Sequence, residues 1–233
     1  MMAPFTVTVL CGILFGAVAF FLVFPMAELI SDRVERDWAI EVKAHALSVQ
    51  DAAAPARHPY PPLQKLGFAI VAVALAFTVL TLYGANAEGV ALVCYFFGLL
   101  LLAAINVKST MLPDVVTFPT LWLGLLYYTY AGSGAEHVYG AVAGYLVPFG
   151  VALAFKLSKG QEVIGQGDLK ALAMAGAWFG VAALPWILAG FVVGSLVWAL
   201  LIKLLGKMLQ GWICTGPAHV MGSVVALLAA RAF

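Results

Sequence analysis

The stretch EGVALVCYFFGLLLLAAI, residues 88–105, carries its only charge at the first position. Its length and composition are typical of a helix that crosses a lipid bilayer, which takes about 20 apolar residues and somewhat fewer inside a bundle. The whole chain has the same character, because 64% of its 233 residues are hydrophobic and 10% are charged. Soluble domains carry about 25% charged residues. This composition excludes a soluble globule and a disordered chain, and it predicts an all-α polytopic membrane helix bundle.

Seven further apolar segments lie on either side of this stretch, so we expect about eight transmembrane helices. The eight segments are residues 4–30, 66–83, 88–105, 115–131, 137–157, 169–181, 184–205 and 213–231. The first segment is too long and too poor in early positive charge for a cleavable signal peptide. The sixth is short for a full span. Short membrane segments usually border a water-filled site, because irregular backbone is tolerated only there.

Basic residues fall almost entirely in the odd-numbered connections between these segments. The even-numbered connections, residues 84–87, 132–136 and 182–183, contain none, and only Arg231 lies on their side. Since cytoplasmic loops carry the excess of Lys and Arg, the odd connections are predicted to be cytoplasmic and both termini periplasmic. The net charge of +1 offers no surface for a polyanion, so no nucleic-acid partner is expected.

The longest polar stretch runs from Ser31 to Gln64. It starts with the charged run SDRVERDWAIEVKAHAL, which predicts a helix capped by Ser31 or Asp32. The chain then divides into residues 1–65, an N-terminal transmembrane helix with a cytoplasmic lobe, and residues 66–233, the membrane core. The three cysteines of the chain are scattered singly and none lies in the lobe, so we predict no metal site there.

Two aspartates at membrane depth are candidate functional residues, because charges there are costly. Asp168 follows Gly165 and Gly167, which let a backbone or an extended substrate approach closely. Asp114 follows Pro113 at the start of a segment, where a helix cap alone would explain it. Both lie on the side predicted to be cytoplasmic. They are therefore able to meet at one depth, as in an aspartic-protease pair, where two carboxyls share one proton.

Two runs of sequence, in this order, resemble a known family. GQGDLKALAMAGAWFG, residues 165–180, resembles the GxGD signature of type IV prepilin peptidases, and INVKSTMLPDVVTFPTLWLGLL, residues 105–126, resembles their upstream motif. The resemblance covers residues 90–233 and implies a membrane aspartic peptidase core over residues 66–233. It implies an eight-helix protein of the bacterial inner membrane, with its active site facing the cytoplasm. Such enzymes cleave the leaders of type IV prepilins or pseudopilins, and many then methylate the new N-terminus with S-adenosylmethionine.

The resemblance also assigns roles by position. Asp168 matches the second catalytic aspartate. The first opens the upstream motif, eight residues before Asp114, and that position is Asn106. Asp114 matches an aspartate that supports structure or substrate. The residues that surround the second motif are Gly165, Gly167, Glu162 and Lys170. The apolar helix of the prepilin partner would lie in the bilayer, against the small residues Ala171, Ala173, Ala175 and Gly176.

The chain departs from the family pattern at two places. Many relatives carry two zinc-binding CxxC pairs in the first cytoplasmic loop, whereas residues 31–65 contain no cysteine. This weakens the case for methylation. Asparagine at position 106 forms hydrogen bonds but cannot serve as a general base. We therefore expect the chain as written to be inactive. A near-isosteric change in an intact motif points to an introduced substitution rather than a natural loss.

Two other functions fit parts of the pattern. The GxGD signature also occurs in intramembrane proteases of the presenilin and signal-peptide-peptidase type, but their late Pro-Ala-Leu motif and Tyr-Asp pair are absent from this chain. A small secondary transporter would use Asp168 as an ion or proton site, and it predicts an inverted repeat. No matching half is found in the sequence.

Overall fold

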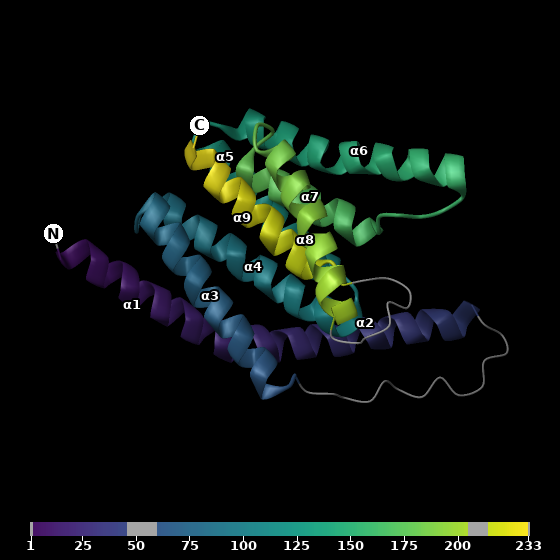
Figure 1. Ribbon diagram of the computed structural model, residues 1–233, viewed down its shortest axis with the longest axis horizontal. Coiled ribbons are helices and arrows are strands. Elements are labelled where there is room, and N and C mark those ends of the chain that lie inside the picture. The colour runs from purple at the N-terminus through teal and green to yellow at the C-terminus, as the bar shows by residue number, and fades with distance from the viewer. Residues whose placement is uncertain (1, 46–59, 205–213, 233) are drawn as a thin grey trace.

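The computed structural model describes residues 2–45, 60–204 and 214–232, and within these ranges the chain forms helices and no strand (Figure 1). The all-α prediction is therefore confirmed. The elements are α1 (Met2–Val18), η1 (Ala19–Val23), α2 (Phe24–His45), α3 (Pro62–Tyr83), α4 (Ala87–Ser109), α5 (Asp114–Tyr130), α6 (Gly134–Lys159), α7 (Gln166–Phe179), α8 (Leu184–Leu204) and α9 (Gly216–Ala232).

Helices α1 and α2 join through η1, a short π-helix, into one continuous rod. The prediction of a new helix starting at Ser31 or Asp32 is wrong, because the apolar segment and the charged run lie on the same helix. No glycine or proline separates them around residue 31, so nothing in the backbone ends the helix there. With the rod counted once, each of the eight predicted segments corresponds to one described helix.

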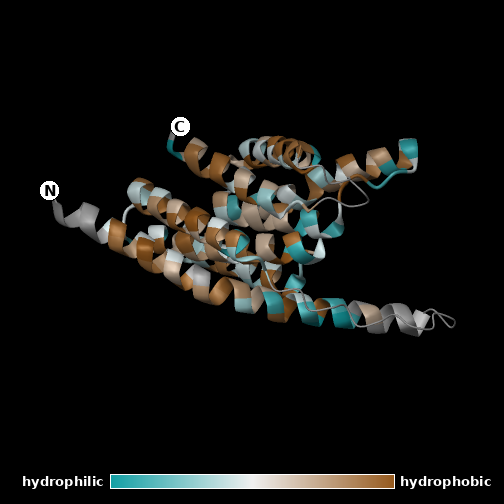
Figure 2. Ribbon diagram, turned by 60° about the horizontal axis from the view of Figure 1, so that its bottom comes forward, coloured by the Kyte–Doolittle hydropathy of each residue, from teal (hydrophilic) through white to brown (hydrophobic). Residues whose placement is uncertain are grey.

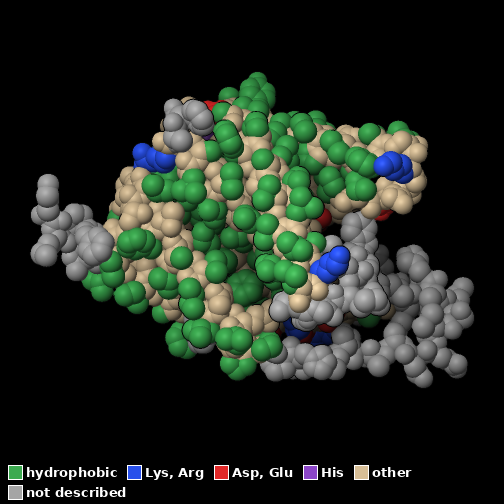
Figure 3. Space-filling model, in the orientation of Figure 1, with side chains coloured by type: hydrophobic (Ala, Val, Ile, Leu, Met, Phe, Trp, Pro, Cys, Tyr) green, Lys and Arg blue, Asp and Glu red, His purple; other side chains and the backbone are tan. Residues whose placement is uncertain are grey.

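Five of the described helices are long and apolar enough to cross a membrane. They are Thr8–Asp37, Pro62–Tyr83, Ala87–Ser109, Gly134–Lys159 and Leu184–Leu204. Helices α5, α7 and α9 have only 17, 14 and 17 residues, so a full crossing by these three remains a prediction. Apolar residues dominate the helices along most of their length (Figure 2) and cover much of the outer face, with basic side chains near its margins (Figure 3).

Helix α4 lies at the centre of the bundle and packs against α2, α3, α5 and α9. Its buried stretch is unbroken from Gly98 to Asn106. Hydrogen bonds tie it to its neighbours in the core, including the Tyr95 hydroxyl with the Ser223 hydroxyl of α9 at 2.6 Å. The central position of α4 matters for the site, because its last turn carries Asn106.

Helices α6 and α7 pack with their backbones in close contact. A Cβ atom added at Gly176 would overlap the Gly140 carbonyl oxygen, and one added at Gly140 would overlap the Gly176 carbonyl oxygen. Neither position therefore accepts a side chain without separating the helices. This contact occupies part of the small-residue face of α7, and Ala171, Ala173 and Ala175 are buried as well. The prediction that this face receives a substrate helix is wrong.

Candidate functional site

The upstream motif forms the end of α4, a short loop and the start of α5. Asn106 lies in the last turns of α4 and is 1% exposed. The helix ends at Thr110, whose φ of 57° places it in the left-handed region. Pro113 precedes α5 in extended conformation and Asp114 opens that helix. Proline suits this position, because its fixed φ is compatible with a helix start and its missing N–H is not needed there.

The downstream motif forms the start of α7. Gly165 precedes the helix in extended conformation, and its backbone N–H donates to Asp168 Oδ2 at 3.3 Å. Asp168 lies in the first turn, where the helix dipole favours a negative charge. Gly167 brings this turn against the upstream loop, since a Cβ atom added there would lie 3.0 Å from Leu112 Cβ. The two motifs, distant in sequence, therefore pack directly against each other.

The start of α9 connects Asn106 to Asp168. The Thr215 hydroxyl donates to Asp168 Oδ1 at 2.5 Å, and the backbone N–H of the next residue, Gly216, donates to Asn106 Oδ1 at 2.7 Å. His219, one turn further along α9, places Nε2 3.0 Å from Asp168 Oδ1. Two adjacent residues thus hold both side chains that the family resemblance assigns to the catalytic pair.

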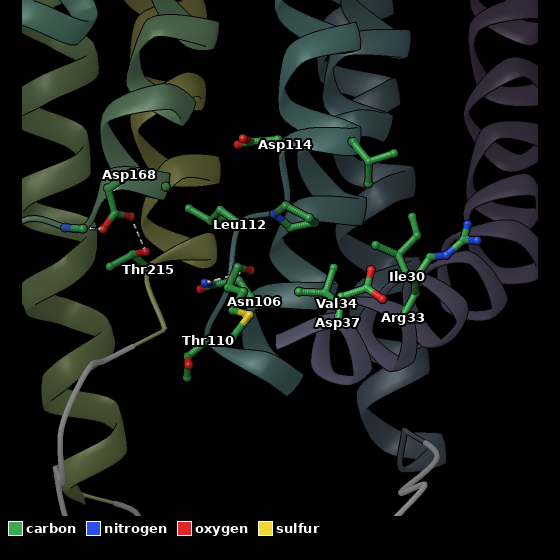
Figure 4. Close-up of a pocket in the computed structure, with 15 residues that line it drawn as sticks. Ile30, Arg33, Val34, Asp37, Asn106, Thr110, Leu112, Asp114, Asp168 and Thr215 are labelled. Carbon is green, nitrogen blue, oxygen red and sulfur yellow. Dashed lines mark hydrogen bonds between the residues drawn. The ribbon is translucent and has the colours of Figure 1, made fainter. Parts of the chain in front are cut away.

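A cavity of about 720 Å³ opens where these elements meet (Figure 4). Five of the seven predicted site residues line it, namely Asn106, Asp114, Gly165, Gly167 and Asp168. Its opposite wall comes from α2, which contributes Arg33 and Asp37. The cavity is therefore formed jointly by the two motifs, the start of α9 and the N-terminal rod.

Lys170 and Glu162, the other two predicted site residues, occupy different positions. Lys170 does not line the cavity, but its Nζ lies 2.8 Å from each carboxylate oxygen of Asp114 and so links α7 to α5. Glu162 is exposed and pairs with Lys156 at 2.7 Å, away from the cavity. Hydrogen bonding and charge attraction from Lys156 lower the pKa of Glu162. The structure thus brings six of the predicted residues into one site and leaves Glu162 outside it.

The residues of the site that were not predicted from the sequence include Arg33, Asp37, Thr215 and His219. His219 was detectable in principle, because it is an ionisable residue within the apolar segment 213–231. Arg33 and Asp37 were hidden by the prediction of a separate solvated lobe after residue 30.

The site has one buried carboxylate, Asp168, beside the amide of Asn106. A carboxylate in this position is able to accept a proton from water, whereas an amide donates and accepts hydrogen bonds without changing its charge. Within the described ranges, no group of three or more His, Cys, Asp or Glu side chains lies close enough together to hold a metal ion.

Comparison with known proteins gives independent information on the family that this chain resembles. Residues 92–204 match the type IV leader peptidase family. The chain is 40% identical over 139 residues to the prepilin leader peptidase/N-methyltransferase of Escherichia coli (strain K12), covering 59% of this chain and 62% of that protein. It is 35% identical over 170 residues to the protein of the same name from Pseudomonas putida, covering 72% and 58%.

A third relative of that name, from Klebsiella pneumoniae, is 49% identical over 90 residues, covering 37% of this chain and 39% of that protein. The aligned residues thus span about three-fifths or less of the length of these curated relatives. No solved structure gives a significant match. The matched residues 92–204 include both motifs that meet at the cavity, and over these residues the chain is similar to the type IV leader peptidase family.

Proposed function

We propose that this chain is a membrane aspartic endopeptidase that removes the leader peptide of type IV prepilins or pseudopilins. The observation that carries the proposal is the convergence of two motifs, about 60 residues apart in sequence, on one cavity. The names of the relatives support the substrate class. We further propose that the protein lies in a bacterial inner membrane, with this cavity on the cytoplasmic side.

In this proposal Asp168 is the general base. It accepts a proton from a water molecule while the water oxygen attacks the scissile carbonyl carbon. A second carboxyl would donate a hydrogen bond to the carbonyl oxygen, as one member of an aspartic pair does. At position 106 the chain has an amide, which is able to donate a hydrogen bond but does not ionise and so has no acidic proton to share. We therefore propose that the chain with Asn106 is the inactive form of the enzyme.

We propose that the protein has two parts with different roles in this reaction. Residues 66–233 are the peptidase core, and residues 1–65 are an N-terminal segment whose helix α2 completes the cavity with Arg33 and Asp37. This division gives the rod a place in substrate binding, because both residues line the same cavity as Asp168.

Methyl transfer to the new N-terminus is the second activity that the relatives' names suggest. The cavity volume of about 720 Å³ lies in the range of small-molecule sites. The negative charge of Asp37 would attract the positively charged sulfonium of S-adenosylmethionine. The positive charge of Arg33 would attract the carboxylate of the cofactor. The cofactor would supply the methyl group. Incubation with prepilin and radiolabelled S-adenosylmethionine tests this part, with Asp37→Asn expected to lower incorporation.

Purified protein and a prepilin in detergent test the peptidase proposal, with leader loss followed by mass spectrometry. Asn106→Asp is expected to raise the cleavage rate by about 10⁴-fold, because removal of one member of a catalytic set commonly costs that much. Adding Asp168→Asn to the same protein should return the rate to its starting value. The absence of cleavage by the Asn106→Asp protein would refute the proposal. Equal rates with and without the Asn106→Asp change would show that position 106 is not the second catalytic position, and Asp114→Ala would be the next variant.

A further inference from the structure

His219 is a buried titratable residue that the proposed reaction does not use. It lies in α9, outside the residues matched to the family, and it is 3% exposed. Its Nε2 lies 3.0 Å from Asp168 Oδ1. Because a carboxylate only accepts hydrogen bonds, this nitrogen must carry the hydrogen and donate it.

The two oxygens of Asp168 have different partners. Oδ1 accepts from both Thr215 Oγ1 and His219 Nε2, at 2.5 and 3.0 Å, so both of its lone pairs are used. Oδ2 has a single partner, the backbone N–H of Gly165, at the longer distance of 3.3 Å. Oδ2 is therefore the oxygen with a lone pair available for a further hydrogen bond.

His219 stands behind Asp168 as seen from the cavity. It does not line the cavity, whereas Asp168 and Thr215 do. Its ring packs on Phe191 of α8, with ring centroids 4.6 Å apart. In the described part of the chain, the charged side chains that line the cavity besides Asp168 are Arg33 and Asp37 from α2 and Asp114 from α5. Lys170 from α7 pairs with Asp114, and Lys108 from α4 pairs with Asp32 from α2. Helices α4 and α8 contribute the neutral Asn106 and Phe191. His219 thus reaches the reaction only through Asp168.

We propose that His219 and Thr215 are positioning residues that hold Asp168 through Oδ1 and leave Oδ2 to react. This inference rests on the proposed peptidase function. As water attacks, one water O–H bond breaks, the water oxygen bonds to the scissile carbonyl carbon, the C=O π pair moves to the carbonyl oxygen, and the proton moves to Oδ2. When the C–N bond breaks, that oxygen re-forms the C=O double bond, the proton moves from Oδ2 to the departing amine nitrogen, and the carboxylate is restored. The two hydrogen bonds on Oδ1 keep the carboxylate charged and correctly oriented before each cycle.

The experiment uses the full chain carrying Asn106→Asp and two single changes. His219→Leu and Thr215→Val each remove one donor to Oδ1 with little change in volume. Each is expected to lower kcat by about 10- to 100-fold with KM unchanged, which is the range for losing a hydrogen bond to a charged group. His219→Gln, which retains a donor, should recover most of the lost kcat.

His137 provides the matched control. It is also a buried histidine, bonded to the Ala177 carbonyl oxygen and stacked on Tyr128 away from the cavity. His137→Leu should change thermal stability but not kcat. If His219→Leu fails to fold, two other variants still test the proposal. Thr215→Val must lower kcat, and His219→Gln must retain most of it. Unchanged kcat in a folded His219→Leu or Thr215→Val protein would overturn it.

A readout without substrate separates this inference from the peptidase function. Infrared difference spectroscopy follows protonation of the Asp168 carboxyl during a pH titration, and the band is assigned by its absence in Asp168→Asn. Loss of either donor should move the midpoint upward by about one pH unit or more, because the charged form loses a hydrogen bond. An unmoved midpoint would overturn the inference. A shifted midpoint without any prepilin cleavage would refute the peptidase function and leave the positioning contact supported.

Discussion

The two aspartates of the site both lie in the first turn of a helix and have opposite surroundings. Asp114 opens α5, its side chain is 49% exposed, and Lys170 binds both of its oxygens. Asp168 lies in the first turn of α7, is buried, and takes its hydrogen bonds from Gly165, Thr215 and His219. The carboxylate of Asp114 is held by an ammonium at both oxygens and so links two helices, whereas Oδ2 of Asp168 has a single, longer hydrogen bond. The partners of each carboxylate, rather than its place in a helix, indicate its role.

The largest expected effect comes from neutralising each aspartate in turn, in the chain carrying Asn106→Asp. Asp168→Asn should lower kcat for leader cleavage by about 10⁴-fold, because it removes a member of the reacting set. Asp114→Asn should cost about tenfold or less, since it removes a link between α5 and α7 but no proton acceptor. Cleavage kinetics on folded, monodisperse protein measure both. Equal losses would contradict the division of roles.

A smaller effect is expected where the two motifs touch. Gly167→Ala places a Cβ atom 3.0 Å from Leu112 Cβ and should push the start of α7 away from the upstream loop. We expect kcat to fall by about 10- to 100-fold, because small displacements of reacting groups are costly. Gly150→Ala in α6 is the matched control, since an added Cβ atom there meets nothing within 4 Å. A loss in the control as large as in Gly167→Ala would refute the steric explanation.

Removing the partner of Asp114 should have a modest effect. Lys170→Met is expected to lower kcat by about threefold and the free energy of unfolding by at most about 1 kcal/mol, as is usual for a partly exposed ion pair. Adding Asp114→Asn to Lys170→Met should cost little more, because the two residues act through one contact. Cleavage rates and thermal melts of the four proteins give this cycle. Additive losses would show that Asp114 contacts the substrate directly.

The smallest effect is expected at Glu162, which the sequence placed at the site and the structure does not. Glu162→Gln should leave cleavage unchanged within about twofold, in line with the small contribution of exposed pairs. Lys156 lowers the pKa of Glu162, so any stabilisation from this pair is present at neutral pH and is lost as the pH falls through the lowered pKa. Cleavage measured from pH 5 to 8 should show no difference between the two proteins. A changed profile would place Glu162 within reach of the substrate.

Much of this fold could be predicted because apolar length and helix-ending residues act locally. The predicted segment 88–105 corresponds to the helix Ala87–Ser109, and the predicted segment 115–131 corresponds to the helix Asp114–Tyr130. Pro113 marks the start of the second helix. The continuous helix through residue 31 was missed, because a change from apolar to charged residues resembles a boundary even where the backbone has no reason to stop.

The sequence predicted the two motifs of the site. It did not predict the contribution of α9. Asp114 and Asp168 were identified as charged residues at membrane depth and Asn106 by resemblance, and the cavity brings them together. The contacts of Thr215 and His219 with Asp168 join residues 47 and 51 positions apart, and they depend on how α9 packs against α4 and α7. No local pattern encodes such a contact. The occupied face of α7 escaped prediction for the same reason, because small residues permit close packing without specifying the partner.

The π-helical turn at Ala19–Val23 determines how α2 is rotated about the helix axis relative to α1. Ile30, Arg33, Val34 and Asp37 face the cavity together because α2 leaves this turn at one particular angle. An α-helix advances about 100° per residue. Deleting one residue from the turn would therefore rotate α2 by about that angle relative to α1 and carry these four side chains off the cavity wall. In this part of the chain the number of residues matters more than their identity.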